Sequence, residues 1–259
     1  SVEGPSDPRS EPQAACRGGH VSTSIVPAVV ITGASSGIGQ AVATALARHR
    51  EYQLILQGRN EDALRDTALR CEALGSPSML CPGDLTSPDT FESLRARLAS
   101  LPHIAALVNN AGAGAFGPTD TFPESDFSHL MRLNVEACFR LTKLVLGSMR
   151  KSRAGTIVNI SSDADTVGFA HAAAYCASKG ALLMMTRALR EELRPAGIRV
   201  CSVSPGRVDT CFNGKRPGMR PGALSAENVA EVVEFVIRCD RNLEIQEVRL
   251  DSMSRHAAG

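Results

Sequence analysis

Three glycines in the segment "VVITGASSGIGQAV", residues 29–42, have the spacing of a phosphate-binding loop. They are Gly33, Gly37 and Gly39, and they stand between a β-branched run and a helical pattern. Without Cβ atoms the backbone can turn tightly and approach a pyrophosphate, and the helix that follows offers unpaired N–H groups and the positive end of its dipole. A glycine turn without a ligand is the alternative, but the position directly after a first strand favours a dinucleotide.

The end of the next apolar run indicates which dinucleotide. An NAD site usually carries an acid there, about 20 residues after the glycines, to bind the ribose hydroxyls. In "LQGRN", residues 56–60, Gly58 takes the place of the acid and Arg59 follows it. A guanidinium suits a 2′-phosphate, so we predict NADP(H). If Arg59 were only a solvated surface residue, the site would discriminate little between the two cofactors.

A phenol and an amine form a second pair of chemical interest. Tyr175 and Lys179, in "AAYCASKG" (residues 173–180), are four residues apart and would lie on one face of a helix. Taken alone, the pair is more simply explained as a packed tyrosine and a lysine that reaches solvent. The rest of the chain has to decide between packing and chemistry.

Composition limits the class of protein. The 259 residues are 43% hydrophobic and 21% charged, which suits a globular chain of one large domain or two small ones. A net charge of +1 creates no global field for nucleic acid or an anionic membrane. No apolar run has membrane-spanning length, and no secretory signal is visible. We therefore expect a cytoplasmic protein without nucleic-acid or membrane partners.

The eight cysteines favour free thiols. They stand at 16, 71, 81, 138, 176, 201, 211 and 239, none in a C-x-x-C pair and several inside apolar runs. Buried free thiols in a reducing compartment are the expected state. No metal site is expected, since the six histidines do not cluster with the cysteines.

Strand and helix patterns alternate from residue 27 onward. Continuous apolar runs predict strands at 28–32, 53–57, 78–82, 104–110, 155–161, 198–205 and 247–250. Periodic patterns predict helices at 40–49, 61–74, 89–100, 174–194 and 227–239, and one long helical region, straight or broken, over about 124–151. Residues 1–24, rich in Pro, Ser and Gly, are expected to form a flexible tail and 251–259 a second one, which leaves one catalytic domain at 25–250.

Strands that are apolar throughout are buried on both faces. Right-handed crossovers through helices then give a parallel sheet. The predicted fold is α/β, a Rossmann-type, doubly wound, parallel seven-stranded sheet with helices on both faces, in a single domain. Its ligand crevice should lie at the carboxyl ends of the strands.

Together these segments resemble the short-chain dehydrogenase/reductase family, in the subgroup with TGxxxGxG and YxxxK. The resemblance covers about residues 27–250. It rests on "TGASSGIG" (32–39), "GDL" (83–85), "NNAG" (109–112), "RLNVE" (132–136), "IVNISS" (157–162), "YCASK" (175–179) and "PGRVDT" (205–210). Each motif is weak alone, but their order and spacing together are specific. The resemblance implies an NADP-dependent oxidoreductase.

The resemblance also implies four catalytic residues. Tyr175 would be the general acid that protonates a carbonyl oxygen during hydride transfer, or the base in the reverse reaction. Lys179 would lower the phenol pKa from about 10 and hydrogen-bond the nicotinamide ribose. Ser162 would polarise the carbonyl, and Asn134 would hold a water that links the lysine to solvent. Simpler roles stay open: Ser161 and Ser162 could cap a strand end, and Asn134 could be an ordinary polar helix residue.

The cofactor residues that the resemblance implies should line one crevice. Asp84 and Leu85 would meet the adenine, although Asp84 could also cap the next helix. "NNAG" would pack round the adenosine ribose, and "PGRVDT" would lie against the nicotinamide unless it is only a strand-ending turn. The expected set is Gly33, Ser35, Ser36, Gly37, Ile38, Gly39, Arg59, Asp84, Leu85, Asn110, Ala111, Gly112, Tyr175, Lys179, Pro205, Gly206, Val208 and Thr210.

The segment that would cover the substrate is short. Only "CFNGKRPGMRPGA", residues 211–223, stands between Thr210 and Leu224, which argues against a closed steroid-type pocket. Its cations, Lys215, Arg216 and Arg220, favour an anionic or carrier-linked substrate such as an oxoacyl thioester or an oxo acid. Charges that merely keep a loop soluble explain them equally well. In the preceding loop, Asp163 and His171 are better explained as solvated residues than as substrate contacts.

Three functions fit these patterns. The favoured one is an NADPH-dependent ketoreductase that reduces a 3-oxoacyl or other oxo compound. The same scaffold could act on an imine, an enone or an epimerisable alcohol. A nonenzymatic dinucleotide sensor is disfavoured, because the four residues of the implied catalytic set are all present. The resemblance further implies a homodimer or homotetramer, paired through the helices with Asn134 and Tyr175, although the apolar run 177–185 could equally be core.

Overall fold

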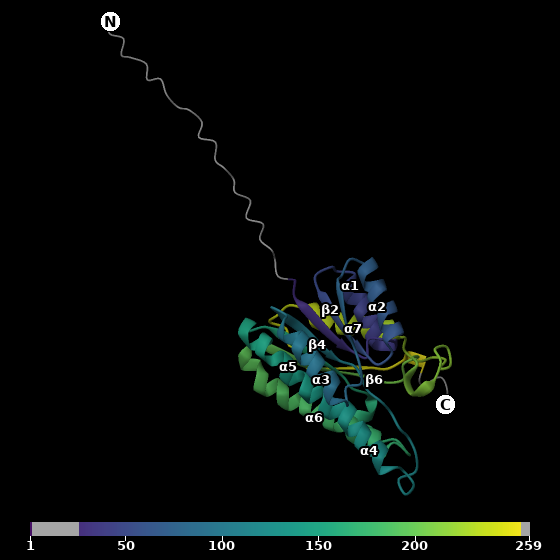
Figure 1. Cartoon of the computed structure of the whole chain (residues 1–259). Helices are drawn as coiled ribbons and strands as arrows, with labels where there is room; N and C mark the ends of the chain where they lie inside the picture. The colour runs from purple at the N-terminus through teal and green to yellow at the C-terminus, as the bar shows by residue number, and fades with distance from the viewer. Residues whose placement is uncertain (2–25, 255–259) are drawn as a thin grey trace.

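A computed structural model describes residue 1 and residues 26–254, and it shows one parallel sheet between two layers of helices (Figure 1). The strands are β1 (Ala28–Thr32), β2 (Gln53–Gly58), β3 (Ser78–Pro82), β4 (Ile104–Asn109), β5 (Gly155–Ile160), β6 (Ile198–Pro205) and β7 (Glu247–Leu250). They pair in the order β3-β2-β1-β4-β5-β6-β7, all in parallel. The predicted doubly wound, seven-stranded, single-domain fold is confirmed.

The helices divide between the two faces of the sheet. One layer holds α1 (Gly37–Ala47), α2 (Glu61–Ala73) and α7 (Ala226–Arg238). The other holds α3 (Pro88–Ala99), α5 (Ala137–Ser152) and α6 (Ala173–Leu193), with α4 (Glu124–Met131) extending beyond the sheet (Figure 1). This arrangement leaves the carboxyl ends of the strands open at one edge of the molecule.

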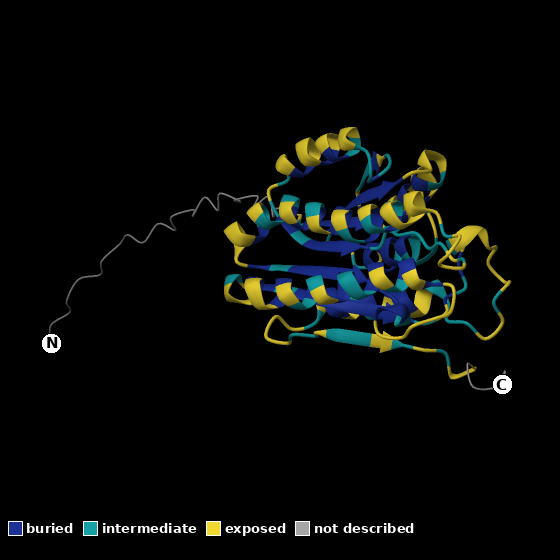
Figure 2. Ribbon diagram, turned by 90° about the horizontal axis from the view of Figure 1, so that it is seen from below, coloured by how far each residue is buried: buried dark blue, intermediate teal, exposed yellow. Residues whose placement is uncertain are grey.

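Alternate residues of the central strands pack on opposite faces. Val29 and Ile31 of β1 belong to the core against α1 and α7, whereas Ala28 and Val30 belong to the core against α3 and α5. The inner strands are therefore buried throughout, while the outward faces of the helices are exposed (Figure 2). The edge strand β7 has no fully buried residue. Continuous apolar runs thus identify the centre of the sheet better than its edge.

Two helices differ from their predicted form. The first begins at Gly37 instead of residue 40, because the glycine turn itself supplies the first helical turn. The long helical region is continuous, but one turn, Arg132–Glu136, has the wider π-helical geometry between α4 and α5. Such turns occur often at functional sites, and this one contains Asn134.

The predicted tails fall largely on residues 2–25 and 255–259, which lie outside the described residues, and so does Cys16. The other seven cysteines are all free, but only Cys71, Cys81, Cys138 and Cys201 are buried. The expectation that the thiols are buried is therefore wrong for Cys211, which is exposed. Within residues 26–254 no helix combines the length and apolar character needed to cross a membrane.

Candidate active site

A cleft of about 1390 Å³ runs along the carboxyl ends of the strands, as the fold predicts. It is lined by the glycine turn after β1, by the residues that follow β2, β3, β4, β5 and β6, and by the first turns of α6. Every residue of the expected cofactor set lines it except Gly39. Ser161 and Ser162 also line it, whereas Asn134 does not. Residues that are far apart in the sequence thus meet in one cavity.

The glycine turn has the shape that a phosphate site needs. Gly33 and Gly37 have φ angles of +64° and +54°, which side-chain-bearing residues rarely adopt. A Cβ atom on Gly39 would lie 2.3 Å from the carbonyl oxygen of Gly33, so Gly39 lets α1 approach the turn without touching the cleft itself. Ser36 precedes α1, and its side chain makes no capping hydrogen bond. The first N–H groups of α1 are therefore left for a ligand, and the turn fits a pyrophosphate.

The "NNAG" segment is tied to the end of β1. The side-chain amide of Asn110 donates to the carbonyl oxygen of Thr32 at 2.9 Å. In return the Thr32 hydroxyl accepts from the backbone N–H groups of Asn110 and Ala111, each at 3.0 Å. These bonds fix the floor of the cleft next to the glycine turn. The motif therefore braces the end of β1 in the centre of the sheet.

The end of β2 is crowded for any side chain in place of Gly58. A Cβ atom on Gly58 would lie 3.1 Å from Oγ of Ser35 and 3.3 Å from Cδ1 of Leu64, so a carboxylate could enter only if its neighbours moved. Arg59 is exposed at the rim of the cleft. This pair of residues fits a 2′-phosphate better than two free ribose hydroxyls.

Asp84 follows β3 and faces the cleft, but it does not cap the next helix. One carboxylate oxygen accepts from the backbone N–H of Thr86 at 2.7 Å and from its hydroxyl at 2.8 Å. Ser87, not Asp84, precedes α3. The Thr86 bonds lower the pKa of Asp84, and the nearby charge of Arg59 lowers it further. The carboxylate is therefore ionised and adds a negative charge to this end of the cleft.

Tyr175, Lys179 and Ser162 come together at the other end of the cleft. Lys179 is buried, and its Nζ atom donates to the carbonyl oxygen of Ile160 at 3.0 Å. The same Nζ lies 5.9 Å from the centroid of the Tyr175 ring. The Ser162 hydroxyl donates to Asp163 Oδ1 at 2.9 Å and accepts from the N–H of Ala164 at 3.2 Å. Ser162 thus caps a short helix at the end of β5, as the simpler explanation held, and also reaches the cleft.

Burial is the main influence on the acidity of the phenol in the chain alone. It raises the pKa of Tyr175 to about 12, and a hydrogen bond with Ser162 only partly offsets this effect. Burial also lowers the pKa of Lys179 to about 8. The Lys179 ammonium is held against the carbonyl of Ile160, and its expected effect on the phenol pKa stays a prediction.

The chain matches the family model described as short chain dehydrogenase over residues 27–220. It belongs to the short-chain dehydrogenase family. A sepiapterin reductase of Chlorobaculum tepidum is 33% identical over 72% of this chain and 80% of the relative. An alcohol dehydrogenase of the archaeon Thermococcus sibiricus, solved with 5-hydroxy-NADP, has a TM-score of 0.83 at 28% identity and covers 88% of this chain and 97% of its own. A metagenomic short-chain oxidoreductase solved with NADP has a TM-score of 0.76 at 31% identity, over 86% and 96% of the two chains.

In this short-chain dehydrogenase, Asn134 braces the site from behind. Its Oδ1 accepts from the N–H of Ala113 at 2.9 Å, and its Nδ2 donates to the carbonyl of Ala113 and to Oγ of Ser178 at 2.9 and 3.0 Å. A Cβ atom on Gly112 would lie 3.1 Å from Asn134 Oδ1 and 3.7 Å from Lys179 Nζ, so the two side chains flank this glycine. The geometry shows a positioning role, and the implied water stays a prediction.

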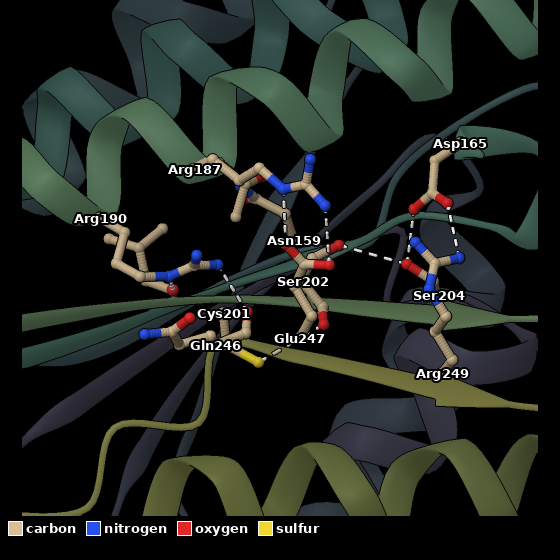
Figure 3. A network of polar contacts seen from close by, with 12 residues as sticks. Asn159, Asp165, Arg187, Arg190, Cys201, Ser202, Ser204, Gln246, Glu247 and Arg249 are labelled. Atoms are coloured by element: carbon tan, nitrogen blue, oxygen red, sulfur yellow. Dashed lines mark hydrogen bonds and ion pairs between the residues drawn. The ribbon is translucent and has the colours of Figure 1, made fainter.

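A buried ion pair, which the sequence analysis did not anticipate, connects the loop of Ser162 to the last strand (Figure 3). The Asp165 carboxylate is completely buried and lies 2.9 Å from Nη1 of Arg249 on β7. Its other oxygen accepts from Oγ of Ser204 on β6 at 2.6 Å. Further along α6, Arg187 forms two hydrogen bonds with Glu247. The edge strand therefore holds both α6 and the short helix that follows Ser162.

The basic loop is not a uniform cationic patch. The Arg220 guanidinium donates to the backbone carbonyls of Val208 and Phe212, so it holds the loop in place. Lys215 lines the cleft, but Arg216 does not. His171 has a φ of +60° and does not line the cleft either. The sequence shows that three cations share this loop. The structure shows that one of them, Arg220, binds backbone carbonyls of the loop itself.

Proposed function

We propose that the chain is an NADPH-dependent ketoreductase that reduces an oxo compound to an alcohol. The observation that carries this proposal is the meeting of Tyr175 and Ser162 in the cleft that also contains the glycine turn. The solved relatives in complex with NADP or NADPH support the cofactor. Relatives named as a sepiapterin reductase and a ketoacyl reductase support the direction of the reaction.

The residues of the cleft fit one elongated dinucleotide. The N–H groups of α1 and the glycine turn would hold the pyrophosphate, and Arg59 would hold the 2′-phosphate. Asp84, Leu85 and the "NNAG" segment would surround the adenosine, and residues 205–210 would lie against the nicotinamide. Lys179 is placed to hydrogen-bond the adjoining ribose if its Nζ shares the bond with Ile160. When bound, NADPH supplies the hydride that reaches the carbonyl carbon.

Two hydroxyl groups would serve the carbonyl oxygen. With a pKa of about 12, Tyr175 is protonated at neutral pH and can give its proton to the developing alkoxide. Ser162 would turn its hydroxyl from Asp163 to the same oxygen and stabilise the negative charge there. One hydride and one proton together convert the ketone into the alcohol. Lys179 would stabilise the phenolate that remains, because its ammonium lies 5.9 Å from the centroid of the Tyr175 ring.

The two tyrosines of the chain provide a matched test. Tyr175→Phe removes the proton donor and should lower kcat for ketone reduction by about 10²- to 10⁴-fold. Tyr52→Phe removes the other phenol, which is partly buried against the core on the α1, α2 and α7 face of the sheet and does not line the cleft, and should leave the rate unchanged. NADPH consumption with a panel of ketones measures both. If Tyr175→Phe keeps its rate, or if NADPH binds and only imines or enones are reduced, the proposal is wrong.

The assembly and the location belong to the same proposal. A homodimer or homotetramer would cover Phe139 of α5 and Met184 of α6, which are exposed in the single chain. Light scattering of the purified protein tests this, and a monomer at micromolar concentration would contradict it. Seven free thiols support a reducing, cytoplasmic setting, where disulfides are rare.

A further inference from the structure

Aromatic rings are concentrated at the substrate end of the cleft. The chain has 8 Phe and 2 Tyr, so ten such rings in all. Four of them line this one cleft: Phe116, Phe169, Tyr175 and Phe212. They come from three different loops and from α6, so no single helix or strand explains the grouping.

The rings surround the proposed proton donor. The centroid of the Tyr175 ring lies 5.5 Å from that of Phe116 and 6.1 Å from that of Phe212, with interplanar angles of 57° and 52°. Phe116 is 53% exposed and Phe169 is 40% exposed. Large apolar faces that stay open inside a concave site are typical of surfaces that a ligand covers.

Small apolar side chains line the cleft together with these rings. Ala113, Ala164 and Ala172 are among its lining residues, and Ala164 and Ala172 are buried. Their methyl groups carry no hydrogen-bonding group. A substrate ring at this end of the cleft therefore meets mainly apolar side chains.

The charges at this end are of both signs. Arg220 donates to two backbone carbonyls but keeps its positive charge. Lys215 and Arg207 also line the cleft, and so does Asp163, whose carboxylate bonds to Ser162. Charge alone therefore does not select the substrate, which leaves the aromatic rings as the selective feature.

We infer that the substrate is a ketone that carries an aromatic or otherwise flat ring near its carbonyl group. The inference rests on the proposed carbonyl reduction. The ring would stack at an angle against Phe116 and Phe212, as aromatic groups prefer, while the carbonyl oxygen meets Tyr175 and Ser162. Oxo compounds with no ring near the carbonyl, such as simple oxoacyl thioesters, are then poor substrates.

Two ketones of matched reactivity test the inference. In 4-phenyl-2-butanone and 4-cyclohexyl-2-butanone the carbonyl is separated from the ring by two methylene groups, so only the flatness of the ring differs. We expect kcat/KM to be about 3- to 10-fold higher for the phenyl compound. Acetoacetyl-coenzyme A, whose reacting carbonyl has no ring nearby, should be used less well than the phenyl compound.

Phe116→Leu should reduce the phenyl preference to about 1 and leave the KM for NADPH unchanged, since leucine keeps the apolar volume but not the flat face. Phe235→Leu is the matched control, because Phe235 is 59% exposed on α7 and does not line the cleft. An equal rate with both ketones, or a preference that survives Phe116→Leu, overturns the inference. Tyr175→Phe would still abolish the rate in that case, so the proposed function would stand.

Direct binding separates the remaining outcomes. Saturation-transfer NMR of the protein with each ketone reports ring contact without turnover. Stronger transfer to the phenyl compound that is lost in Phe116→Leu supports the ring site, even if no ketone is reduced and the proposed function fails. Equal transfer to both compounds overturns the ring site, whatever the rates are.

Discussion

Removal of the Arg249 charge should destabilise the protein more than removal of its partner's charge. Arg249→Met leaves the Asp165 carboxylate buried with a single hydrogen bond, from Ser204. Asp165→Asn removes the charge that needs a partner, and its amide oxygen can still accept from Ser204. Truncating one member of a fully buried ion pair destabilises by about 3–5 kcal/mol. The Arg249 side chain is 42% exposed, so water can solvate part of the carboxylate after the substitution. We therefore expect Arg249→Met to lower the free energy of unfolding by about 1–3 kcal/mol.

Thermal and urea unfolding measure this difference. For a domain of this size each kcal/mol shifts Tm by about 2–4 °C, so Arg249→Met should melt several degrees lower. Asp165→Asn should lower the free energy of unfolding by about 1 kcal/mol. The double variant should be more stable than Arg249→Met alone, because no buried charge is left unpaired.

An exposed ion pair provides the control for this experiment. Arg95 and Glu92 of α3 are 64% and 65% exposed, and Arg95→Met should have no measurable effect. The reasoning is refuted if Arg249→Met unfolds like the wild type, or if the two single effects simply add in the double variant. An effect of Arg95→Met as large as that of Arg249→Met would also refute it.

Three other changes have outcomes that follow from the structure. Lys179→Met should abolish activity but stabilise the fold at pH 7 by up to roughly 3 kcal/mol, because burial lowers the lysine pKa from 10.5 to about 8. Between pH 8 and pH 10.5 the unfolded chain binds more protons than the folded chain, so the free energy of unfolding of the wild type rises with pH. In urea unfolding, the greater stability of Lys179→Met should therefore shrink from about pH 8 upward. Gly39→Ala should abolish NADPH binding, measured by calorimetry, because the added Cβ would clash with the carbonyl oxygen of Gly33. Gly147→Ala is the control, because a Cβ there has no atom within 4 Å, and it should stabilise α5 by about 0.5–1 kcal/mol. Arg59→Ala should raise the KM for NADPH about tenfold or more and leave that for NADH unchanged; equal effects on both cofactors would contradict the role given to Arg59.

The sequence predicts the centre of the sheet and the positions along the cleft because both follow from local patterns. Short apolar runs such as "AVVIT" and "QLILQ" are typical of buried strands. The residues that follow parallel strands must meet at one edge of the sheet. That geometry brings Gly33, Asp84, Asn110 and Ser162 together without any knowledge of their contacts. The wide π-helical turn at Asn134 has no such signal, because its residues have ordinary helical patterning.

Contacts between distant segments could not be predicted in the same way. Asp165 and Arg249 are 84 positions apart, and their pairing depends on β7 joining the sheet beside β6. An acid three residues after Ser162, together with the lone arginine of "EVRL", is a weak signal that becomes clear only once the strand order is known. The role of Arg220 was hidden for a related reason. A cation in a glycine-rich loop can bind a ligand or the loop's own carbonyls, and composition does not distinguish the two.

The buried groups around Tyr175 keep its phenol in the protonated form. With a pKa of about 12 the phenol carries its proton at pH 7. Forming the phenolate at that pH costs about 7 kcal/mol at this pKa and about 4 kcal/mol at an ordinary one. Asp163 and Asp165 both add to the increase, whereas Asp165 also helps keep Lys179 protonated. The same carboxylates therefore keep the proton on the phenol and the charge on the lysine beside it, which is the protonation state from which the proposed ketone reduction would start.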